Sequence, residues 1–306
     1  MTFFKNHAGI NITGAKLQLV EVDYKESDQS AGNSGFYLEN VDEEFFTEFL
    51  ELSFPETKII NILQNAFNEI ILRKPLQTNY ISFSLPDNFF KIFQLPVDSK
   101  ITDSDLREHL KWEVSVLYPD CDQDNFIIRH IENSDASGTN IKHAVVFAAF
   151  KKYLKIIHKF GVRNNLILKF ADNAHVAADT FLLNKTAVSI LLDEKTFSLS
   201  VLKNRNLLFF KTFQNNSVAD IPLILKDELI LSPVVKRGIE SNQIYISGNF
   251  ISEGLIKKLE ETTNCKFVPI NPFEKLKISA TLTTSDFVNK NAHTFTSAAG
   301  IALRLI

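Results

Sequence analysis

The sequence is poor in cysteine, and its two cysteines are far apart. Cys121 and Cys265 form no CxxC or Cys/His spacing in a chain of 306 residues. A pair of this kind encodes neither a zinc site nor a disulfide framework, so the sequence favours a reducing compartment. We expect a cytoplasmic protein without a structural metal.

The sequence also lacks a long apolar run and an excess of positive charge. No apolar segment approaches the 18 or so residues that cross a bilayer, and residues 1–6 have no signal-peptide pattern. The formal net charge is −3, and the lysines near residue 151 have the spacing of a solvated helix face. These absences argue against direct membrane insertion and against nucleic-acid binding, so any membrane contact is expected through a partner.

Catalytic and calcium-binding motifs are absent or incomplete. The seven histidines show no HExxH spacing, and none belongs to a recognisable nucleophile motif. Asp120, Asp122 and Asp124 imitate the first ligands of a calcium loop. However, Asn125 occupies the glycine position and Ile131 the position of the bidentate glutamate. We expect a solvated acidic loop there.

What the chain does contain is apolar material with clear periodicity. Hydrophobic residues make up 45% of the sequence, which suffices for a large core in two domains or one elaborated domain. Residues 8–23 alternate around Thr13-Gly14, the pattern of a strand, a tight turn and a returning strand. A third strand is predicted at 36–41, and a helix with one buried stripe after Pro55.

The middle of the chain predicts a strand at 80–85 and a capped helix. This helix begins at the Thr102-x-x-Asp105 sequence, a capping-box pattern. Trp112 lies beside its buried stripe and is expected to be partly buried. The residues predicted to form that stripe are Leu106, Leu110, Val114 and Leu117.

Two strands and a further helix follow. The strands are predicted at 126–131 and 141–149, and the helix at 151–160 is predicted to end at Gly161 in the C′ position.

The second half of the chain repeats the first in outline. Residues 187–202 predict another hairpin, and 207–213 a third strand. A short helical segment at 218–239 precedes a strand at 243–247 and a helix at 252–263. Two related halves with a cleft between them are the expected result.

Several short segments follow one another in a recognisable order. They are Gly9-Ile10-Asn11-Ile12, Lys111-Trp112-Glu113 with Tyr118-Pro119, Ile246-Ser247-Gly248, Asn271-Pro272-Phe273-Glu274 and Ala298-Ala299-Gly300-Ile301. Taken together, these segments resemble the type IV pilus assembly protein PilM family, a relative of the cell-division protein FtsA within the actin and Hsp70 superfamily. The resemblance runs nearly end to end, and it depends on the order and spacing of segments that are individually unspecific.

The resemblance implies a mixed α/β protein with the actin-like ATPase fold. This fold has two RNase H-like halves around a cleft, here with an FtsA/PilM-type inserted subdomain and a reduced second insertion. The implied parts are a first subdomain at 1–79, completed by 164–180 and 293–306; an inserted subdomain at 80–163; and a second subdomain at 181–292 with a short insertion at about 214–242.

The resemblance places a nucleotide site at three turns, and the first has lost residues that grip ATP. Asn11 stands where ATP-binding members have an acid, and Thr13 where they have a glycine. Magnesium prefers anionic oxygens, whereas Asn offers a neutral carbonyl. A Thr side chain obstructs the approach of backbone N–H groups to phosphate. Gly14 and Lys16 remain available as phosphate contacts.

The other two turns are degenerate as well. Leu191 and Asp193 stand at the positions of the family's Asp and Gly; a slip of register would let Asp193 serve as the acid, but no glycine follows. Because phosphoryl transfer relies on cradling and metal charge, we expect neither ATP hydrolysis nor tight binding of ATP and magnesium. If a nucleotide did bind, its contacts would come from Asn11, Thr13, Gly14, Lys16, Asp193, Gly248 and Asn249.

The function implied by the resemblance is that of a non-catalytic cytoplasmic scaffold in a type IV pilus or related bacterial secretion machine. Its implied partner is the short cytoplasmic tail of a PilN-like, single-span inner-membrane protein, bound near residues 80–163 and the N-terminal sheet.

Three other readings of the sequence stay open. The first is an active actin-like ATPase or kinase-like enzyme with Asp193 as the metal-binding acid. The second is an FtsA-like filament former, which would be expected to carry a terminal amphipathic helix. The third is a type II secretion protein, which would continue into a membrane span. Self-association is also left open.

Overall fold

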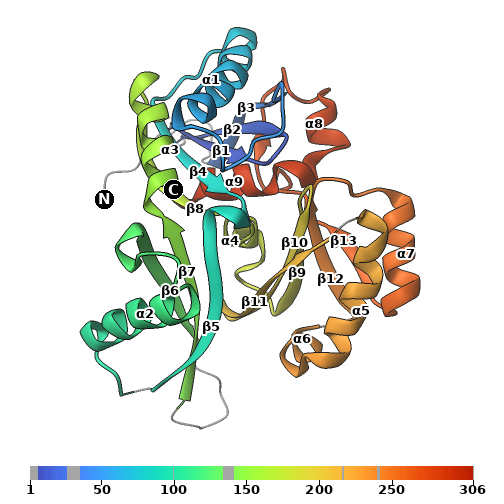
Figure 1. Cartoon of the computed structure of the whole chain (residues 1–306). Helices are drawn as coiled ribbons and strands as arrows, with labels where there is room; N and C mark the ends of the chain where they lie inside the picture. The colour runs from blue at the N-terminus through green and yellow to red at the C-terminus, as the bar shows by residue number, and fades with distance from the viewer. Residues whose placement is uncertain are drawn as a thin grey trace.

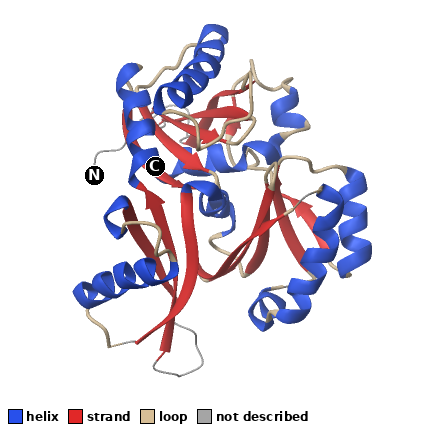
Figure 2. Cartoon of the chain, viewed as in Figure 1, coloured by secondary structure: helices blue, strands red, loops and turns tan. Residues whose placement is uncertain are grey.

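The computed structural model describes residues 6–25, 35–98, 100–133, 141–215, 217–239 and 242–305. Three sheets with flanking helices make up this part of the chain (Figures 1 and 2). Two of the sheets form the cores of two halves, and the third forms a smaller inserted unit. Within the described residues, no helix has both the length and the apolar character of a bilayer span.

The first sheet combines an antiparallel meander with parallel strands. Its spatial order is β14-β3-β2-β1-β4-β8, and β4 and β8 join β1 in parallel. The hairpin predicted at 8–23 is confirmed as β1 and β2. The strands are β1 (Asn6–Ile12), β2 (Lys16–Lys25), β3 (Gly35–Phe45), β4 (Tyr80–Leu85), β8 (Ile167–Asn173) and β14 (Lys277–Ile278).

Helices pack on both faces of this sheet, which explains why most of β1 and β2 is buried. On one face, α1 (Glu56–Arg73) and α3 (Lys151–Arg163) share a core with β1, β2 and β4. Toward the other face lie α4 (Ala174–Ala178), α8 (Asp286–Asn289) and α9 (Thr296–Ala302).

The second sheet has the same plan, with the spatial order β11-β10-β9-β12-β13. Three strands again form an antiparallel meander, and two more add in parallel. The predicted internal repeat is therefore confirmed, and it extends to five strands of each sheet; β14 has no counterpart among the described strands of the second sheet. The elements of this half are β9 (Ala187–Leu192), β10 (Thr196–Lys203), β11 (Asn206–Gln214), α5 (Ile221–Leu231), α6 (Pro233–Gly238), β12 (Gln243–Gly248), α7 (Glu253–Thr263) and β13 (Lys266–Pro269).

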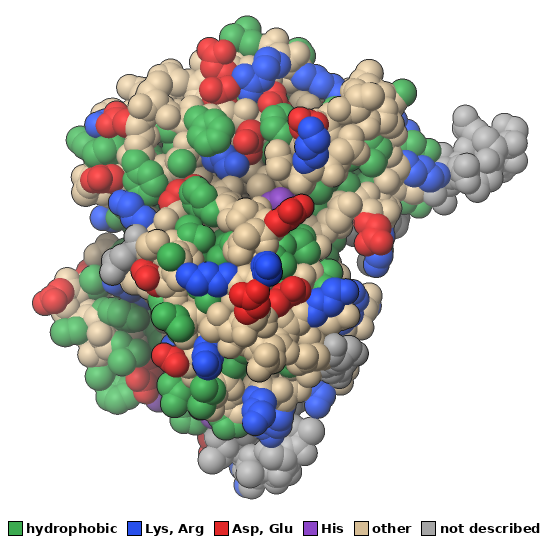
Figure 3. Space-filling model, turned by 90° about the vertical axis from the view of Figure 1, so that its right-hand side faces the viewer, with side chains coloured by type: hydrophobic (Ala, Val, Ile, Leu, Met, Phe, Trp, Pro, Cys, Tyr) green, Lys and Arg blue, Asp and Glu red, His purple; other side chains and the backbone are tan. Residues whose placement is uncertain are grey.

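The face of the molecule that Figure 3 shows carries basic and acidic side chains side by side, and neither sign dominates it. Such a mixed surface offers no extended basic patch for a nucleic acid on this face.

The inserted unit is a three-stranded antiparallel sheet with one helix. Its order is β5-β7-β6. One face packs on the helix through an apolar core that includes Leu106 and Leu110, and the other contacts the second half through the rings of Phe147 and Phe210, 5.3 Å apart. The elements are β5 (Phe90–Asp98), α2 (Asp103–Leu117), β6 (Phe126–Asn133) and β7 (Ile141–Phe150).

The inserted unit is smaller than the span of 80–163 expected from the sequence. β4 pairs with β1 in the first sheet, and α3 packs on that sheet through Phe160, whose ring contacts those of Phe67 and Phe83. The insertion therefore runs from about residue 86 to residue 150. The partner of a short apolar strand cannot be read from the strand itself, which is why the boundary was misplaced.

The second subdomain likewise ends before residue 292. β14 pairs with β3, and Phe273 and Leu276 lie in the core of the first half. The segment from about residue 273 onward thus completes the first half.

The predicted end of α3 was wrong. α3 does not end at Gly161 but continues to Arg163. The left-handed residue that ends it is Asn165, with φ of 55°, and the Leu166 N–H then bonds to the Gly161 carbonyl, as in a Schellman cap. An asparagine tolerates this conformation well enough to replace the expected glycine.

The outer side of α2 is more exposed than predicted. Thr102 caps the helix, and Leu106, Leu110 and Val114 are buried as expected. Leu117, however, is 49% exposed and Trp112 is 57% exposed. Trp112 stacks on His109 of the same helix instead of packing into the core.

α9 approaches its neighbours closely because glycines stand at the contacts. A Cβ on Gly300 would overlap the carbonyl oxygen of Ala177 in α4, and a Cβ on Gly9 would overlap that of Ala298. The His7 ring, 2.7 Å from the Ala302 carbonyl oxygen, fixes the end of the helix against β1.

We expect the substitution Gly300→Ala to lower the free energy of unfolding by about 1–3 kcal/mol, because α4 and α9 must separate to admit the methyl group. The matched control is Gly254→Ala in α7, where the Ser252 Oγ, 3.9 Å away, is the nearest atom to the added carbon. That control should be neutral or stabilise by up to about 1 kcal/mol. Urea denaturation checks both, and a Gly300→Ala protein as stable as the parent would contradict the close approach.

Candidate functional site

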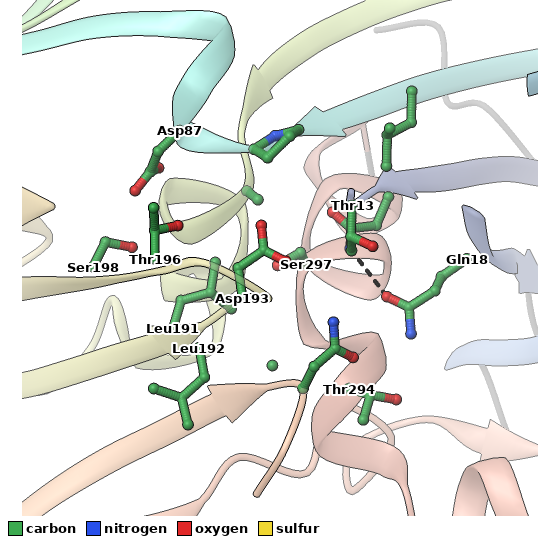
Figure 4. Close-up of a pocket in the computed structure, with 16 residues that line it drawn as sticks. Thr13, Gln18, Asp87, Leu191, Leu192, Asp193, Thr196, Ser198, Thr294 and Ser297 are labelled. Carbon is green, nitrogen blue, oxygen red and sulfur yellow. Dashed lines mark hydrogen bonds between the residues drawn. The ribbon is translucent and has the colours of Figure 1, made fainter. Parts of the chain in front are cut away.

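The two halves meet at a cleft where the turns of the two hairpins face each other. Thr13 belongs to the β1–β2 turn, Asp193 to the β9–β10 turn, and Gly248 ends β12. All three line one pocket, and Figure 4 shows Asp87 and Ser198 beside them. The structure thus brings together the three turns that the sequence analysis selected.

Of the seven residues named as nucleotide contacts, five line this pocket and two do not. The five are Asn11, Thr13, Asp193, Gly248 and Asn249. Gly14 lies next to them in the turn. Lys16 is turned away, with its Nζ 2.7 Å from the Glu43 carboxylate.

The free space in the cleft is small. Its cavity volume is about 20 Å³, room for roughly one water molecule. Side chains of the protein fill the rest.

The Glu194 carboxylate lies between the turns and takes their hydrogen-bond donors. Its Oε1 accepts from the Thr13 hydroxyl at 3.0 Å and from the Asn249 amide at 3.2 Å. Its Oε2 accepts from the Gly14 backbone N–H at 3.3 Å. Backbone N–H groups of such a turn are the donors that cradle phosphate in nucleotide sites. We call this set of contacts the Glu194 latch.

The next residue, Lys195, adds a second contact across the cleft. Its Nζ lies 4.4 Å from the centre of the Phe49 ring. That ring packs against Gly14, where any Cβ would overlap it. In this structure the glycine therefore makes room for an aromatic ring of the protein.

The Thr13 hydroxyl also shapes its own turn. Besides donating to Glu194, it accepts hydrogen bonds from the N–H groups of Ala15 and Lys16, each at 3.1 Å. A side-chain hydroxyl that bonds to backbone groups two and three residues on stabilises a turn. Thr13 thus has a local structural role.

Asn11 belongs to a row of polar side chains that crosses four neighbouring strands. The Ser84 hydroxyl donates to Asn11 Oδ1 at 2.9 Å, and Asn11 Nδ2 donates to Gln18 Oε1 at 3.0 Å. Gln18 Nε2 in turn donates to Glu43 Oε2 at 2.9 Å. The row needs one group at Asn11 that both accepts and donates, which an amide supplies and a carboxylate does not.

Asp87 is a cleft residue that the sequence analysis missed. It follows β4 through Pro86, and it accepts from the Asn173 amide at 2.6 Å and from the Thr212 hydroxyl at 2.8 Å. Burial raises the pKa of this carboxyl. Because Thr212 belongs to β11, Asp87 joins the two halves. Its position directly after the predicted strand at 80–85 could have indicated a cleft residue, because ligand sites in such folds lie at the carboxyl ends of the parallel strands.

A buried polar network lies behind the cleft. The two ring nitrogens of His175 lie 2.8 Å from the Ser198 hydroxyl and 2.7 Å from the Ser189 hydroxyl. Ser189 and Ser200 both donate to the Asp179 carboxylate. Burial lowers the pKa of His175 to about 3 and raises that of Asp179 to about 7.

This Ser-His-Asp grouping was not visible in the sequence, because the fold assembles it. His175 and Ser200 are fully buried, and Asp179 is 2% exposed. Ser198 also lines the cleft, and the contacts of His175 with Ser198 and Ser189 join α4 to the second sheet.

Among the described residues, no group of three or more His, Cys, Asp or Glu side chains has the geometry of a metal site. In the acidic loop after α2, the Asp122 side chain accepts the Asp124 N–H at 2.9 Å and so caps a short 3₁₀ helix (Gln123–Asn125).

Comparison with known proteins shows the class of structure to which this cleft belongs. No family model matches the chain, and no curated protein matches it. Among solved structures, a Bacteroides thetaiotaomicron VPI-5482 protein with actin-like ATPase fold and unknown function aligns with a TM-score of 0.53 at 10% identity, covering 97% of this chain and 95% of that one. The chain has the actin-like ATPase fold, as predicted.

A second similar structure is that of the PilM-PilN type IV pilus biogenesis complex. It aligns with a TM-score of 0.77 at 16% identity and covers 99% of both chains. At this identity the likeness is one of fold.

We expect the substitution Glu194→Ala to loosen the contact between the hairpin turns. It removes the acceptor for three donors, including the Gly14 N–H. The free energy of unfolding should fall by about 1–3 kcal/mol, and the Gly14 amide should exchange faster with deuterium. The control Glu261→Ala, on the exposed side of α7, should change neither. Unchanged exchange at Gly14 would disprove the latch.

We also expect Asp193 to make stability depend on pH. Burial raises its pKa well above the ordinary 3.8, and the adjacent Glu194 carboxyl raises it further. The folded protein then keeps a proton that the unfolded chain loses, so this contribution to stability is complete below about pH 4 and is lost as pH rises through the folded-state pKa, with a slope of at most about 1.4 kcal/mol per pH unit.

The substitution Asp193→Asn tests this expectation. Its urea midpoint should fall less than that of the parent between pH 4 and pH 8, so the variant gains relative stability at the upper end. The exposed Asp227→Asn should follow the parent curve. Parallel curves for Asp193→Asn and the parent would rule out a raised pKa at this site.

Proposed function

We propose that this protein is a non-catalytic scaffold of a type IV pilus or related secretion machine, which binds the short cytoplasmic tail of a PilN-like, single-span inner-membrane protein. The observation that carries the proposal is the fold, which aligns over 99% of this chain with a chain of the PilM-PilN complex. In the present protein, the Glu194 side chain closes the cleft between the two halves.

The residues of the cleft do not fit magnesium-ATP. Phosphate oxygens would need the donors that Glu194 occupies, and its carboxylate would repel them. Both ends of the Asn11 amide already have partners, Ser84 and Gln18, and its neutral oxygen is a weaker partner for a metal's water shell than a carboxylate. We therefore infer no reaction step that involves a nucleotide.

The alternative, an active ATPase or kinase-like enzyme, would use Asp193 as its metal-binding acid. The free space beside Asp193 holds about one water molecule, and the Glu194 carboxylate already takes the hydrogen-bond donors of the facing turn. The cleft as it stands therefore has no room beside Asp193 for a metal ion together with a nucleotide phosphate.

The edge of the first sheet supports the proposed position of the tail. β8 is the last strand of that sheet, and among the described strands it pairs only with β4. It exposes Ile167 and Phe170, each 42% accessible, and in Figure 1 it lies next to the inserted sheet. An exposed strand edge with apolar side chains suits an extended peptide that adds a strand. We assign the tail to this edge, within the region implied by the family resemblance.

Calorimetric titration of the nucleotide-stripped protein tests the proposal in two parts. We expect no saturable heat with magnesium-ATP up to millimolar concentration, and saturable heat with the cytoplasmic tail peptide of a PilN-like protein from the same genome. Phe170→Glu should weaken the affinity for the tail peptide at least about tenfold, because one apolar anchor is lost. Phe250→Glu, at an exposed position of the second half, should leave this affinity unchanged. Micromolar ATP binding would indicate a nucleotide-dependent switch instead of a scaffold. Absence of binding by the tail peptide would overturn the proposal that a PilN-like protein is the partner.

A further inference from the structure

A second pocket lies on the inserted sheet and shares no lining residue with the nucleotide cleft. It opens between α2 and β6 and has a volume of about 380 Å³. Apolar side chains form its floor: Leu110 is 1% exposed, Phe126 is 5% exposed, and Ile128 is partly buried. The volume lies within the usual range of ligand pockets.

Four basic residues belong to the lining of this pocket. Arg107 and Lys111 come from α2, Arg129 from β6, and Lys151 from the start of α3. Asp124 is the acidic residue in the lining. Of the ion pairs between described residues, none includes any of the four basic side chains. The pocket is thus a concentrated positive site on a protein whose net charge is −3.

The basic residues outnumber the one acidic residue in this lining. Arg107 and Lys111 stand at positions i and i+4 of one helix, where like charges repel. Arg129 and Lys151 bring further positive charge to the same pocket. An anionic group among them would relieve the repulsion and gain charge-assisted hydrogen bonds.

The strand beside the pocket has a free edge. Among the described strands, β6 pairs only with β7, so its outer edge presents backbone N–H and C=O groups to a further strand. A segment added there would run along β6 and direct alternate side chains toward α2.

The charges around the pocket favour a narrow polypeptide over a flat anionic membrane. The first turn of α2 contains Asp103 and Asp105, and Asp120 and Asp122 follow its other end. A flat surface would meet these carboxylates together with the basic residues. An extended chain inside the groove would meet mainly the basic residues.

We propose that the pocket between α2 and β6 binds an extended acidic segment of a partner protein. The segment pairs with the edge of β6, places Asp or Glu carboxylates against Arg107 and Lys111, and packs an apolar side chain on the floor at Phe126. The planar guanidinium groups suit carboxylates, which they bind with two hydrogen bonds. This site is independent of the proposed tail contact at β8.

The probe for the test is a short fluorescein-labelled peptide in which Glu alternates with Val, with a Lys/Val peptide of the same length as its control. We expect the Glu peptide to bind the full-length protein saturably and the Lys peptide not to bind. The double variant Arg107→Glu with Lys111→Glu should weaken binding at least about tenfold. The double variant Lys257→Glu with Lys275→Glu changes the net charge equally at exposed positions elsewhere and should bind like the parent.

Several outcomes would overturn the proposal. Equal weakening in both double variants would show that net charge, and not the pocket, attracts the peptide. Binding to phosphatidylglycerol vesicles without binding to the peptide would assign the site to a membrane. The single variant Arg107→Gln is the control for misfolding. We expect it to bind the Glu peptide more weakly than the parent while its urea midpoint stays unchanged, and binding equal to the parent would overturn the role of Arg107.

Hydrogen exchange tests the strand pairing separately. We expect the bound peptide to slow the exchange of amides at residues 126–132, because the free edge of β6 becomes paired. Peptide binding with unchanged exchange at these residues would overturn the pairing.

Discussion

The Glu194 carboxylate and the donors around it hold the two halves of this protein in one arrangement. In a fold with two halves around a cleft, something must bridge the turns that face each other. A charged acceptor shared by a hydroxyl, an amide and a backbone N–H is a strong bridge, because each hydrogen bond is charge-assisted. Asp87 supplies a second bridge to β11, and the side chain of Lys195 on Phe49 a third.

The residues that differ from the ATP-binding pattern have partners that explain their presence. Asn11 completes a row of hydrogen bonds across four strands, and Thr13 closes its own turn. Both residues suit contacts within the protein. Gly14, which the sequence analysis kept as an available phosphate contact, admits the Phe49 ring instead. The cleft is therefore built as a packed interface between halves, and its small volume is the result.

The sequence predicted those elements that depend on residues close together along the chain. The β1–β2 hairpin, the Thr102 cap and the repeat in the second half follow from short-range patterns of apolar and turn residues. The three turns of the cleft were found through the family resemblance. What joins them could not be found, because Glu194 and Gly14 are 180 residues apart and nothing near either residue marks the contact. The exposure of Trp112 was also missed, because the sequence of a helix does not show which of its faces other elements will cover.

The packing of α9 ties the end of the described chain to its beginning. His7 in β1 contacts the carbonyl of Ala302, 295 residues away, and Gly9 lies against the same helix. During synthesis, β1 and β2 are made long before α9, which cannot cover their open face until residues 296–302 have also been made. Contacts of such long range slow folding, and an uncovered apolar face is prone to aggregation in the meantime. The core of the first half is therefore completed late, by a helix that is made after the whole of the second half.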